Sequence, residues 1–235
     1  MRILHLADLH FDLEHYAWVE RQASSYDLVV IAGDLLERFG SDTPIPSQQQ
    51  LVLGSLRRIA KKCKWLAVCT GNHDVGRDGD WLSALKELPN CILDYQNKLI
   101  GENEPILITC CPWAEPDDLR GEYRLEKLLG EAAMIKTKHK AQWFIVHHSP
   151  PGFGKEGELL VRAIKSDKPD LIFNGHDHRT PFVGAPFVKM ASTLCLNPGS
   201  PIKSRRLDVP PYINIDTGKR TAVWQWGEKQ LAAKM

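Results

Sequence analysis

The sequence has little of several features, and each shortage excludes a class of protein. Lysine and arginine total 30 against 29 acidic residues, so the net charge is only +1. This excludes a protein coated with positive charge and a protein with an acidic tail, although a local basic groove stays possible. No run approaches the roughly 18 apolar residues of a membrane-spanning helix. The opening MRILHLADLH is too short and too polar for a signal peptide. We therefore expect a cytoplasmic protein that has no membrane partner.

Cysteine is scarce and shows no motif. The six cysteines include no Cys-Xaa-Xaa-Cys pair, and most lie in apolar runs such as ILITCC and STLCLNP. We expect reduced thiols that fill the core in a reducing compartment. Linkers rich in glycine and serine, low-complexity stretches and internal repeats are absent too. The 235 residues are enough to bury a large core, and we expect one domain over 1–235 with a short polar tail at 227–235.

What the sequence does have is an alternation of short apolar runs with longer helical patterns, which predicts an α/β fold. Several of the runs are apolar on both faces, as strands covered on both sides are. Strands are predicted at 2–7, 27–33, 65–71, 106–111, 143–148 and 170–176. Helices are predicted at 47–62, 121–138 and 156–166, the first with Ser47 as its N-cap.

After residue 186 the pattern changes to short strands joined by Pro/Gly turns. The segments FVKMAST, TLCLN, YINIDT and AVWQW fit antiparallel strands that complete a second sheet.

Metal-ligand residue types follow five of the predicted strands. Because ligands bind at the carboxyl ends of strands in open α/β sheets, these side chains are expected at one edge. Any one motif alone fits a polar turn or a helix cap, but five such strand ends in one chain do not fit that explanation. The residues concerned are Asp8, His10, Asp34, Asn72, His73, Asp74, His147, His148, His176 and His178.

The chemistry of this set points to two divalent transition-metal ions. Mixed oxygen and nitrogen donors without cysteine suit Mn, Fe or Zn and disfavour Ca and Mg. The ligands are too many for one tetrahedral ion, and Asp34 on a central strand is the natural bridge between two. A metal pair about 3.5–4 Å apart can hold a hydroxide nucleophile and clamp a phosphoryl oxygen. Metal charge would then bind phosphate without any basic excess in the composition.

The ordered motifs Asp8-x-His10, Gly33-Asp34, GNHD at 71–74, His147 and GHDH at 175–178 resemble the calcineurin-like metallophosphoesterase superfamily. The resemblance spans residues 8–178, and the turn NPGS at 197–200 resembles that family too. It implies a two-sheet β-sandwich flanked by helices, a four-layer α/β sandwich, with a dinuclear centre at the sheet edge. Mn²⁺ is the metal that the resemblance favours.

The resemblance also assigns ligands. One metal would be held by Asp8, His10, Asp34 and His178, and the other by Asp34, Asn72, His147 and His176. Alternate strand residues face opposite ways, so only one of His147 and His148 points to the metals. The resemblance favours the first histidine of the pair, and we therefore predict His147.

His73 is predicted to be catalytic. It would contact the scissile phosphate together with Asn72 and protonate the leaving oxygen, since histidine titrates near neutral pH. Asp74 would fix its ring and raise its pKa. Arg38 is a further candidate for phosphate binding, as are Arg77 and Arg179, although each fits a loop charge paired with an acid equally well.

The other histidines have structural interpretations. His5 is expected in the core, whereas His15 and His139 lie in helical patterns and are expected to be solvated.

The opening MRILHLADLHFD resembles the nuclease branch of the superfamily most, and the chain is too short for the extra capping domain of large repair nucleases. We predict a phosphodiesterase, a DNA-repair endonuclease that cleaves DNA with single-stranded character by attack of a metal-bound hydroxide. Candidate basic grooves with aromatic platforms are the segments 57–65, 136–143 and 203–212. DNA-repair proteins are candidate partners, and a homodimer could use Trp113, Trp224 and Trp226, unless these pack in the core.

Two other functions stay open at this stage. The same site could cleave a small substrate, namely a cyclic nucleotide, a nucleotide pyrophosphate or a phosphomonoester. A non-catalytic metal-binding scaffold is an alternative of another class, but such a protein would be expected to lose ligands that this chain keeps.

Overall fold

The apolar runs form the strands of two facing sheets in the computed structural model, which describes residues 1–74, 80–114, 118–178, 185–200 and 207–235. The first sheet has seven strands in the order β13-β12-β11-β1-β2-β3-β4. β1 to β4 are parallel, whereas β11, β12 and β13 continue the sheet beyond β1 in antiparallel pairs. Its strands are β1 (Arg2–Leu6), β2 (Leu28–Ala32), β3 (Trp65–Cys69), β4 (Cys91–Ile92), β11 (Tyr212–Asp216), β12 (Thr221–Trp226) and β13 (Lys229–Lys234).

The second sheet has six strands in the order β5-β6-β7-β8-β10-β9. The four central strands are parallel, and the outer strands β5 and β9 are antiparallel to their neighbours. Its strands are β5 (Gln96–Ile100), β6 (Ile106–Cys111), β7 (Gln142–His147), β8 (Leu171–Phe173), β9 (Phe187–Met190) and β10 (Thr193–Leu196).

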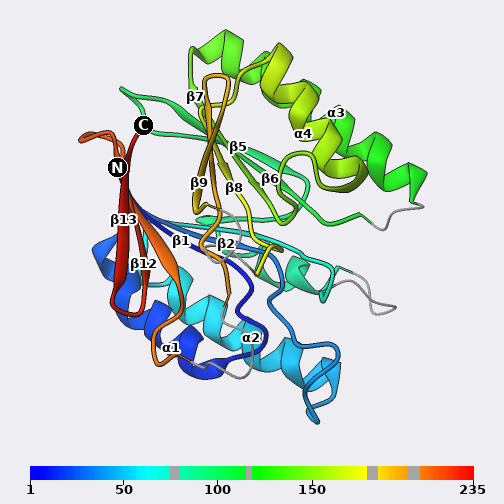
Figure 1. Ribbon diagram of the computed structural model, residues 1–235. Helices are drawn as coiled ribbons and strands as arrows, with labels where there is room; N and C mark the ends of the chain where they lie inside the picture. Colours follow the sequence, from blue (N-terminus) through cyan, green and yellow to red (C-terminus); the bar gives the residue numbers. More distant parts are fainter. Residues whose placement is uncertain (75–79, 115–117, 179–184, 201–206) are drawn as a thin grey trace.

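Helices cover the outer face of each sheet, so the molecule has four layers (Figure 1). α1 (Leu13–Gln22) and α2 (Ile45–Ala60) lie on the seven-stranded sheet, and α3 (Leu119–His139) and α4 (Gly154–Ser166) lie on the six-stranded sheet. Two short 3₁₀ helices, η1 (Ala23–Ser25) and η2 (Trp81–Leu85), lie within connections of the first half. This confirms the predicted four-layer α/β sandwich.

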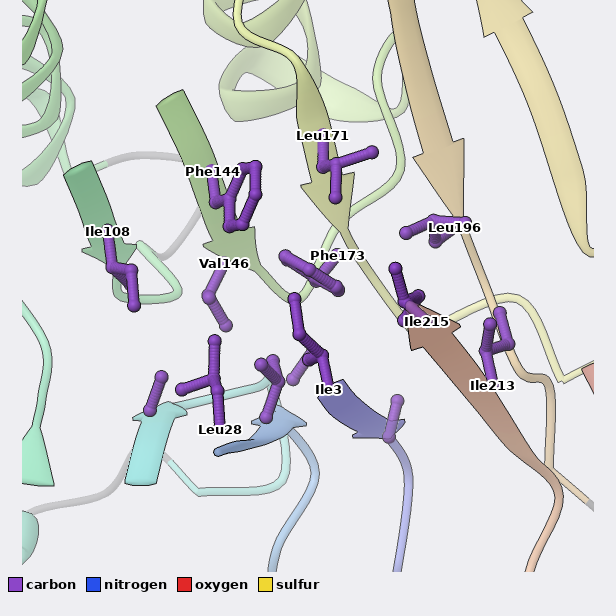
Figure 2. Packing of buried hydrophobic residues seen from close by; sticks show 14 of the residues in the cluster. Ile3, Leu28, Ile108, Phe144, Val146, Leu171, Phe173, Leu196, Ile213 and Ile215 are labelled. Carbon is purple, nitrogen blue, oxygen red and sulfur yellow. The ribbon is translucent and has the colours of Figure 1, made fainter. Parts of the chain in front are cut away.

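The core has three parts, one for each junction between layers. Figure 2 shows the part between the sheets, where Ile3 and Leu28 of the first sheet face Phe144, Val146 and other residues of the second. The neighbouring strand residues pack the other way, against the helices. Both faces of the central strands are therefore buried, which explains why their sequences are apolar throughout.

Three expectations about chain segments were wrong. The predicted polar tail at 227–235 contains β13, which pairs with β12 through backbone hydrogen bonds that its exposed side chains do not reveal. The late strands do not all join the second sheet, because β11 and β12 lie beside β1 in the first. Ser47 is not an N-cap, since α2 begins at Ile45 after Pro44, and proline suits a helix start.

The expectations for residues outside the site had mixed outcomes. All six cysteines are free and buried, as expected. His5 is fully buried, also as expected. His15 is not solvated but buried, with its Nε2 2.7 Å from the Leu207 carbonyl oxygen. Trp224 and Trp226 pack in the core between the sheets, so core packing accounts for both. Among the residues that the structure describes, none of the helices is long and apolar enough to span a membrane.

Candidate metal centre

The ends of five parallel strands meet at one edge of the sandwich and bring carboxylate, amide and imidazole groups together. β1, β2 and β3 of the first sheet supply one set, and β7 and β8 of the second supply the other. The backbone links the two sheets here, because the His176 N–H donates to both carboxylate oxygens of Asp8 at 3.1 Å. The residues that meet are Asp8, His10, Asp34, Asn72, His73, His148, His176 and His178.

The first half of this centre consists of Asp8, His10, Asp34 and His178. One ligand atom from each lies within 4.8 Å of all the others. The Nε2 atoms of His10 and His178 are 3.0 Å apart, and His178 Nε2 is 3.4 Å from Asp8 Oδ1. Both aspartates are buried. This is the ligand set predicted for the first metal, and the structure brings all four residues together.

The second half is built around Asn72. Its Oδ1 lies 3.0 Å from His148 Nε2 and 2.9 Å from His176 Nδ1, and these two nitrogens are 3.1 Å apart. Asn72, which follows β3, and His176, which follows β8, were both predicted for this metal. The third residue of this group, however, is His148 and not the predicted His147.

Asp34 lies between the two halves. Its Oδ2 is 3.8 Å from His10 Nε2, and its Oδ1 is 3.4 Å from His148 Nε2. Burial alone would raise the pKa of Asp34, but the hydrogen bond and charge of His148 lower it far below its usual range. Asp34 is therefore an anion with one oxygen toward each half, which is the arrangement of a bridging ligand.

The prediction that His147 rather than His148 points to this centre was wrong. Phe144 and Val146 face the core between the sheets, whereas Trp143 and Ile145 face α3 and α4. Strand side chains alternate, so the even-numbered His148 continues the inner face and His147 the outer face. The Nδ1 of the fully buried His147 lies 3.1 Å from the Cys111 carbonyl oxygen.

The backbone at this edge adopts conformations that cost free energy. Asp8, His10, Asp34 and His176 all have positive φ angles, between 45° and 67°. Such left-handed residues cost about 1–3 kcal/mol each and gather at functional sites. This strain aims the four side chains inward, and the rest of the sandwich must compensate for it.

Three glycines make room for the ligands. A Cβ on Gly33, which has φ +80°, would lie 2.5 Å from the His148 ring, and one on Gly71 would lie 2.3 Å from Asp34 Oδ1. A Cβ on Gly175 would lie 2.6 Å from Asp8 Oδ2. The glycines of the GD, GNHD and GHDH motifs are therefore required by close packing against ligand side chains.

The donor set fits divalent metal ions. His148 Nδ1 donates to the Ala32 carbonyl oxygen at 3.0 Å, so Nε2 is the nitrogen that faces Asn72 and Asp34 and that would bind an ion once it gives up its own proton. The nitrogens of His10 and His178 lie 3.0 Å apart and those of His148 and His176 3.1 Å apart, so both members of each pair would be within reach of one ion. As metal ligands these residues stay predictions, but their positions and tautomers suit the role.

Asp74 does not orient His73, which corrects the predicted dyad. Its carboxylate is buried and accepts the backbone N–H groups of Leu35, Leu36 and Gly71 at 2.8–3.1 Å. Burial, followed by the charge of Asp34, raises the pKa of Asp74 to about 8, against the opposing effect of these N–H donors. Asp74 ties the loop after β3 to the loop after β2, so its role is to position the backbone of the site.

His73 lies beside the first half of the centre. Its Nε2 is 3.9 Å from Asp34 Oδ2, and its ring is 4.7 Å from that of His10. Its Nδ1 lies 3.3 Å from the Arg38 backbone nitrogen, which donates the hydrogen. Nδ1 is thus the acceptor, and in neutral His73 the proton resides on Nε2, on the side of Asp34.

The sequence interpretation missed Glu37. This buried carboxylate lies 3.7 Å from His73 Nδ1 through Oε1 and 3.7 Å from His10 Nδ1 through Oε2. Its only signal was an acidic residue three positions after Asp34 in GDLLER. The Arg38 side chain is exposed beside His73 and its phosphate role stays a prediction, whereas Arg77 and Arg179 lie outside the described residues.

A cavity of about 800 Å³ opens beside this centre. Its lining includes Asp8, His10, His73 and His178 from the site, with Phe39 at its rim. The other lining residues are Leu9, those at 11–15, Glu37, Gly40, Ser41 and Ser200. A group bound in this cavity would contact the ligand residues of the first half directly.

The basic segments proposed as grooves lie elsewhere. The segments 57–65 and 136–143 end at the amino ends of β3 and β7, the edge opposite to the metal centre. Arg58 and Lys62 both bind Glu20 at 2.8 Å, and Trp143 is fully buried and offers no stacking face. In the third segment, 203–206 lies outside the described part of the chain, and Tyr212 packs against Trp18.

The chain belongs to the calcineurin-like phosphoesterase family, whose sequence pattern matches residues 1–180. Members of this family are metal-dependent phosphoester hydrolases, and the clustered ligands agree with that chemistry. No curated protein is similar enough in sequence to count as a match.

Solved structures show the same fold at low sequence identity. The protein TT1561 of Thermus thermophilus has a TM-score of 0.60 and 15% identity, over 99% of this chain and 98% of that chain. A hypothetical protein from the same organism has a TM-score of 0.52 and 14% identity, over 100% and 99%. A novel archaeal phosphodiesterase has a TM-score of 0.51 and 16% identity, over 100% of both chains.

Proposed function

We propose that the protein is a dinuclear-metal-dependent phosphodiesterase that cleaves DNA with single-stranded character. The observation that carries this proposal is Asp34, whose two oxygens face two separate clusters of ligand atoms at one edge of the sandwich. The cavity beside this centre provides space for a substrate. The archaeal relative of the same fold is described as a phosphodiesterase, which supports diester rather than monoester chemistry.

The chain's own residues would hold the metals and place the phosphate. Two divalent ions, when bound, supply Lewis acidity that activates water and neutralises phosphoryl charge. Asp8, His10, Asp34 and His178 would hold one ion, and Asp34, Asn72, His148 and His176 the other. His147 is replaced in this assignment because its ring faces the helices.

His73 would supply the proton for the leaving oxygen. Its Nε2 faces Asp34 Oδ2, while the Arg38 backbone N–H donates to Nδ1 and fixes the ring. A proton on Nε2 is therefore aimed at a group bound between the ligands and the cavity. Arg38 stays the candidate for binding a phosphate oxygen, since its side chain is exposed and its guanidinium lies 5.6 Å from the centroid of the Phe39 ring.

The resemblance of MRILHLADLHFD to the nuclease branch is the basis for DNA as the substrate. Manganese is the metal that the same resemblance favours, with iron or zinc as alternatives.

A second candidate is a phosphoesterase acting on a small substrate, and a specific observation favours it. Within the described part of the chain, the cavity lining contains neither lysine nor arginine, but it does contain Asp12, Glu14 and Glu37. A long polyanion usually needs a basic groove along its path. A cyclic nucleotide or an aryl phosphodiester is small enough to bind through the metals and the cavity residues nearest to them, without a basic groove.

An activity matrix of metals against substrates tests both candidates. Protein stripped with a chelator would be loaded with Mn²⁺, Zn²⁺, Fe²⁺ or Mg²⁺ and incubated with circular single-stranded DNA, the matching duplex, a cyclic nucleotide, an aryl phosphodiester and an aryl phosphomonoester. We expect Mn²⁺-dependent cleavage of the single-stranded circle and of the aryl diester. Cleavage of the cyclic nucleotide or the monoester without any DNA cleavage would establish the second candidate. Absence of both bound metal and activity would indicate a scaffold.

A further inference from the structure

Two exposed phenylalanines pack against different histidines at the edge that carries the metal centre. Phe39 is 77% exposed and Phe153 is 51% exposed, although both rings lie against site histidines. Single exposed apolar side chains are common on protein surfaces. Two that each contact a different histidine of one site form a stronger pattern.

Phe39 belongs to the side of Asp34 Oδ2. Its ring centroid is 5.2 Å from that of His73 at an interplanar angle of 82°, and it lines the cavity together with His10 and His178. The Arg38 guanidinium lies 5.6 Å from the centroid of the Phe39 ring. A flat group in the cavity could therefore stack on Phe39 while its attached phosphate reaches His73.

Phe153 belongs to the side of Asp34 Oδ1. Its ring centroid is 4.5 Å from that of His176, and the Trp113 ring lies 5.4 Å from the same histidine. Gly152 and Gly154, with φ of +87° and +65°, flank Phe153 at the start of α4. The Phe153 N–H donates to the Pro150 carbonyl oxygen at 3.0 Å, so the backbone that carries this ring is fixed.

The two rings match a substrate that carries a flat group on each side of its phosphorus atom. A phosphodiester has two substituents, whereas a monoester has one. We infer that Phe39 and Phe153 stack the two nucleobases that flank the scissile phosphate. The substrate class is then a single-stranded oligonucleotide, whose bases can leave their own stack. This inference rests on the proposed function, because it requires phosphodiester cleavage at the metal centre.

Stacking platforms also replace the basic groove that the described part of the cavity lacks. Stacking of one base on an aromatic side chain changes affinity by roughly 5- to 150-fold and tolerates every base. Two platforms could therefore hold a single strand beside the metals without a row of lysines. A duplex would bind less well, because its bases already stack on one another.

The test uses the metal-loaded full chain and oligothymidylates that contain one cleavable phosphate, the other linkages being methylphosphonates. The nucleoside on either side of that phosphate is thymidine or an abasic residue. Kinetics with the wild type, Phe39→Ala, Phe153→Ala and the double variant give KM and kcat separately. Phe39→Trp and Phe153→Trp keep an aromatic face, whereas Phe39→Leu and Phe153→Leu keep only apolar bulk. Met134→Ala, on the exposed face of α3, is the matched control.

We expect each alanine or leucine variant to raise KM by roughly 5- to 150-fold, with a smaller effect on kcat, and each tryptophan variant to retain the wild-type KM. An abasic residue on one side should abolish the effect of one phenylalanine but not of the other. Unchanged KM in both alanine variants of an active nuclease would overturn the inference alone. A wild type that cleaves aryl diesters but no oligonucleotide would overturn both the inference and the nuclease function. Metal content of every variant, measured in parallel, separates loss of stacking from loss of the centre.

Discussion

The two ends of β2 carry an aspartate each, and the environments of these two aspartates differ in almost every respect. Asp27, before the strand, accepts the Arg2 backbone N–H at 2.8 Å and binds the Lys64 ammonium group at 3.0 Å. The backbone N–H of Arg2, which outweighs partial burial, and Lys64 lower its pKa. Asp34, after the strand, is buried, has a left-handed backbone and is surrounded by imidazoles.

The amino and carboxyl edges of the sandwich use their polar side chains differently. At the amino ends of the strands, carboxylates close the sheet: Asp170 accepts the Trp143 N–H at 2.8 Å much as Asp27 accepts that of Arg2. At the carboxyl ends, ring nitrogens of His148 and of the partly exposed His10, His176 and His178 lie in pairs about 3 Å apart, where a bound cation would accept their lone pairs. The amino edge stabilises the fold, and the carboxyl edge uses part of that stability to hold candidate ligands on a strained backbone.

The largest expected effect comes from removing the negative charge at either end of β2. Asp34→Asn should release both metals and lower kcat/KM by more than about 100-fold, because even partners of metal ligands cost 10- to 100-fold. Asp27→Asn should keep metal and activity and lose about 1 kcal/mol of unfolding free energy. Metal analysis, kinetics on an aryl diester and urea titration measure the three effects. Full metal content in Asp34→Asn would contradict the bridging assignment.

The two histidines at the end of β7 lie at the same edge but have different partners, so their removal should have different effects. His148→Ala should lose the metal of the Asn72 half and most activity, since its Nε2 faces Asn72 and Asp34. His147→Ala should keep that metal but lose about 2–3 kcal/mol of stability, because a fully buried ring that binds a carbonyl is removed. Metal stoichiometry decides between them, and the reverse result would restore the original choice of His147.

The Asp74 carboxylate holds together the loops that follow β2 and β3 at the carboxyl edge. Asp74→Ala leaves the buried N–H groups of Leu35, Leu36 and Gly71 without an acceptor and should cost about 3 kcal/mol. Asp74→Asn retains one acceptor oxygen and should cost less. Chemical denaturation of the metal-free proteins measures both. If instead Asp74 acted only on His73, both variants would keep wild-type stability and lose activity.

His5 lies in the core, between the amino and carboxyl edges. Its burial makes the free energy of unfolding depend on pH. Its Nε2 is shared by the Asn174 and Leu196 carbonyl oxygens, and burial lowers its pKa to about 4 from 6.5. The unfolded chain therefore binds more protons between these values, and stability falls as the pH drops from 6.5 toward 4. Between pH 7 and pH 5 the loss should be about 2 kcal/mol.

The matched variant for this prediction is His5→Gln, whose amide can donate to the same carbonyls without titrating. The difference in unfolding free energy between wild type and variant should change by that amount over the same pH range. A constant difference from pH 7 to pH 5 would show that His5 does not become protonated on unfolding.

Much of the fold could be predicted because patterning and packing agree. The strand β6 was located at its observed bounds, since ILITCC is apolar on both faces and lies between helical patterns. α1 was indicated only by the helical pattern around His15 and received no bounds, because the apolar residues in LEHYAWVERQ are few. β13 was missed because its pairing lies in the backbone rather than in its exposed side chains.

The site was predictable in residue type but not in detail. Ligand residue types after strand ends indicated the edge where they meet. The choice between His147 and His148 failed because WFIV is apolar on both faces. The sequence therefore does not show which residues of this strand face the other sheet and which face the helices. Glu37 and Asp74 were misjudged for a related reason: adjacency in sequence does not show which way a side chain points after a sharp turn.

The smallest expected effect comes from the basic cluster at the amino edge. Lys62 and Arg58 both bind Glu20 on α1, and their hydrogen bonds lower the pKa of that partly exposed carboxyl group. Because they lie at the edge opposite to the metal centre, Arg58→Ala and Lys62→Ala should leave KM for single-stranded oligonucleotides unchanged. Each should lower stability by at most about 1 kcal/mol, the usual range for surface ion pairs. A KM that rises more steeply with salt in wild type than in the double variant would place a nucleic-acid path across this edge and remove the distinction between the two ends.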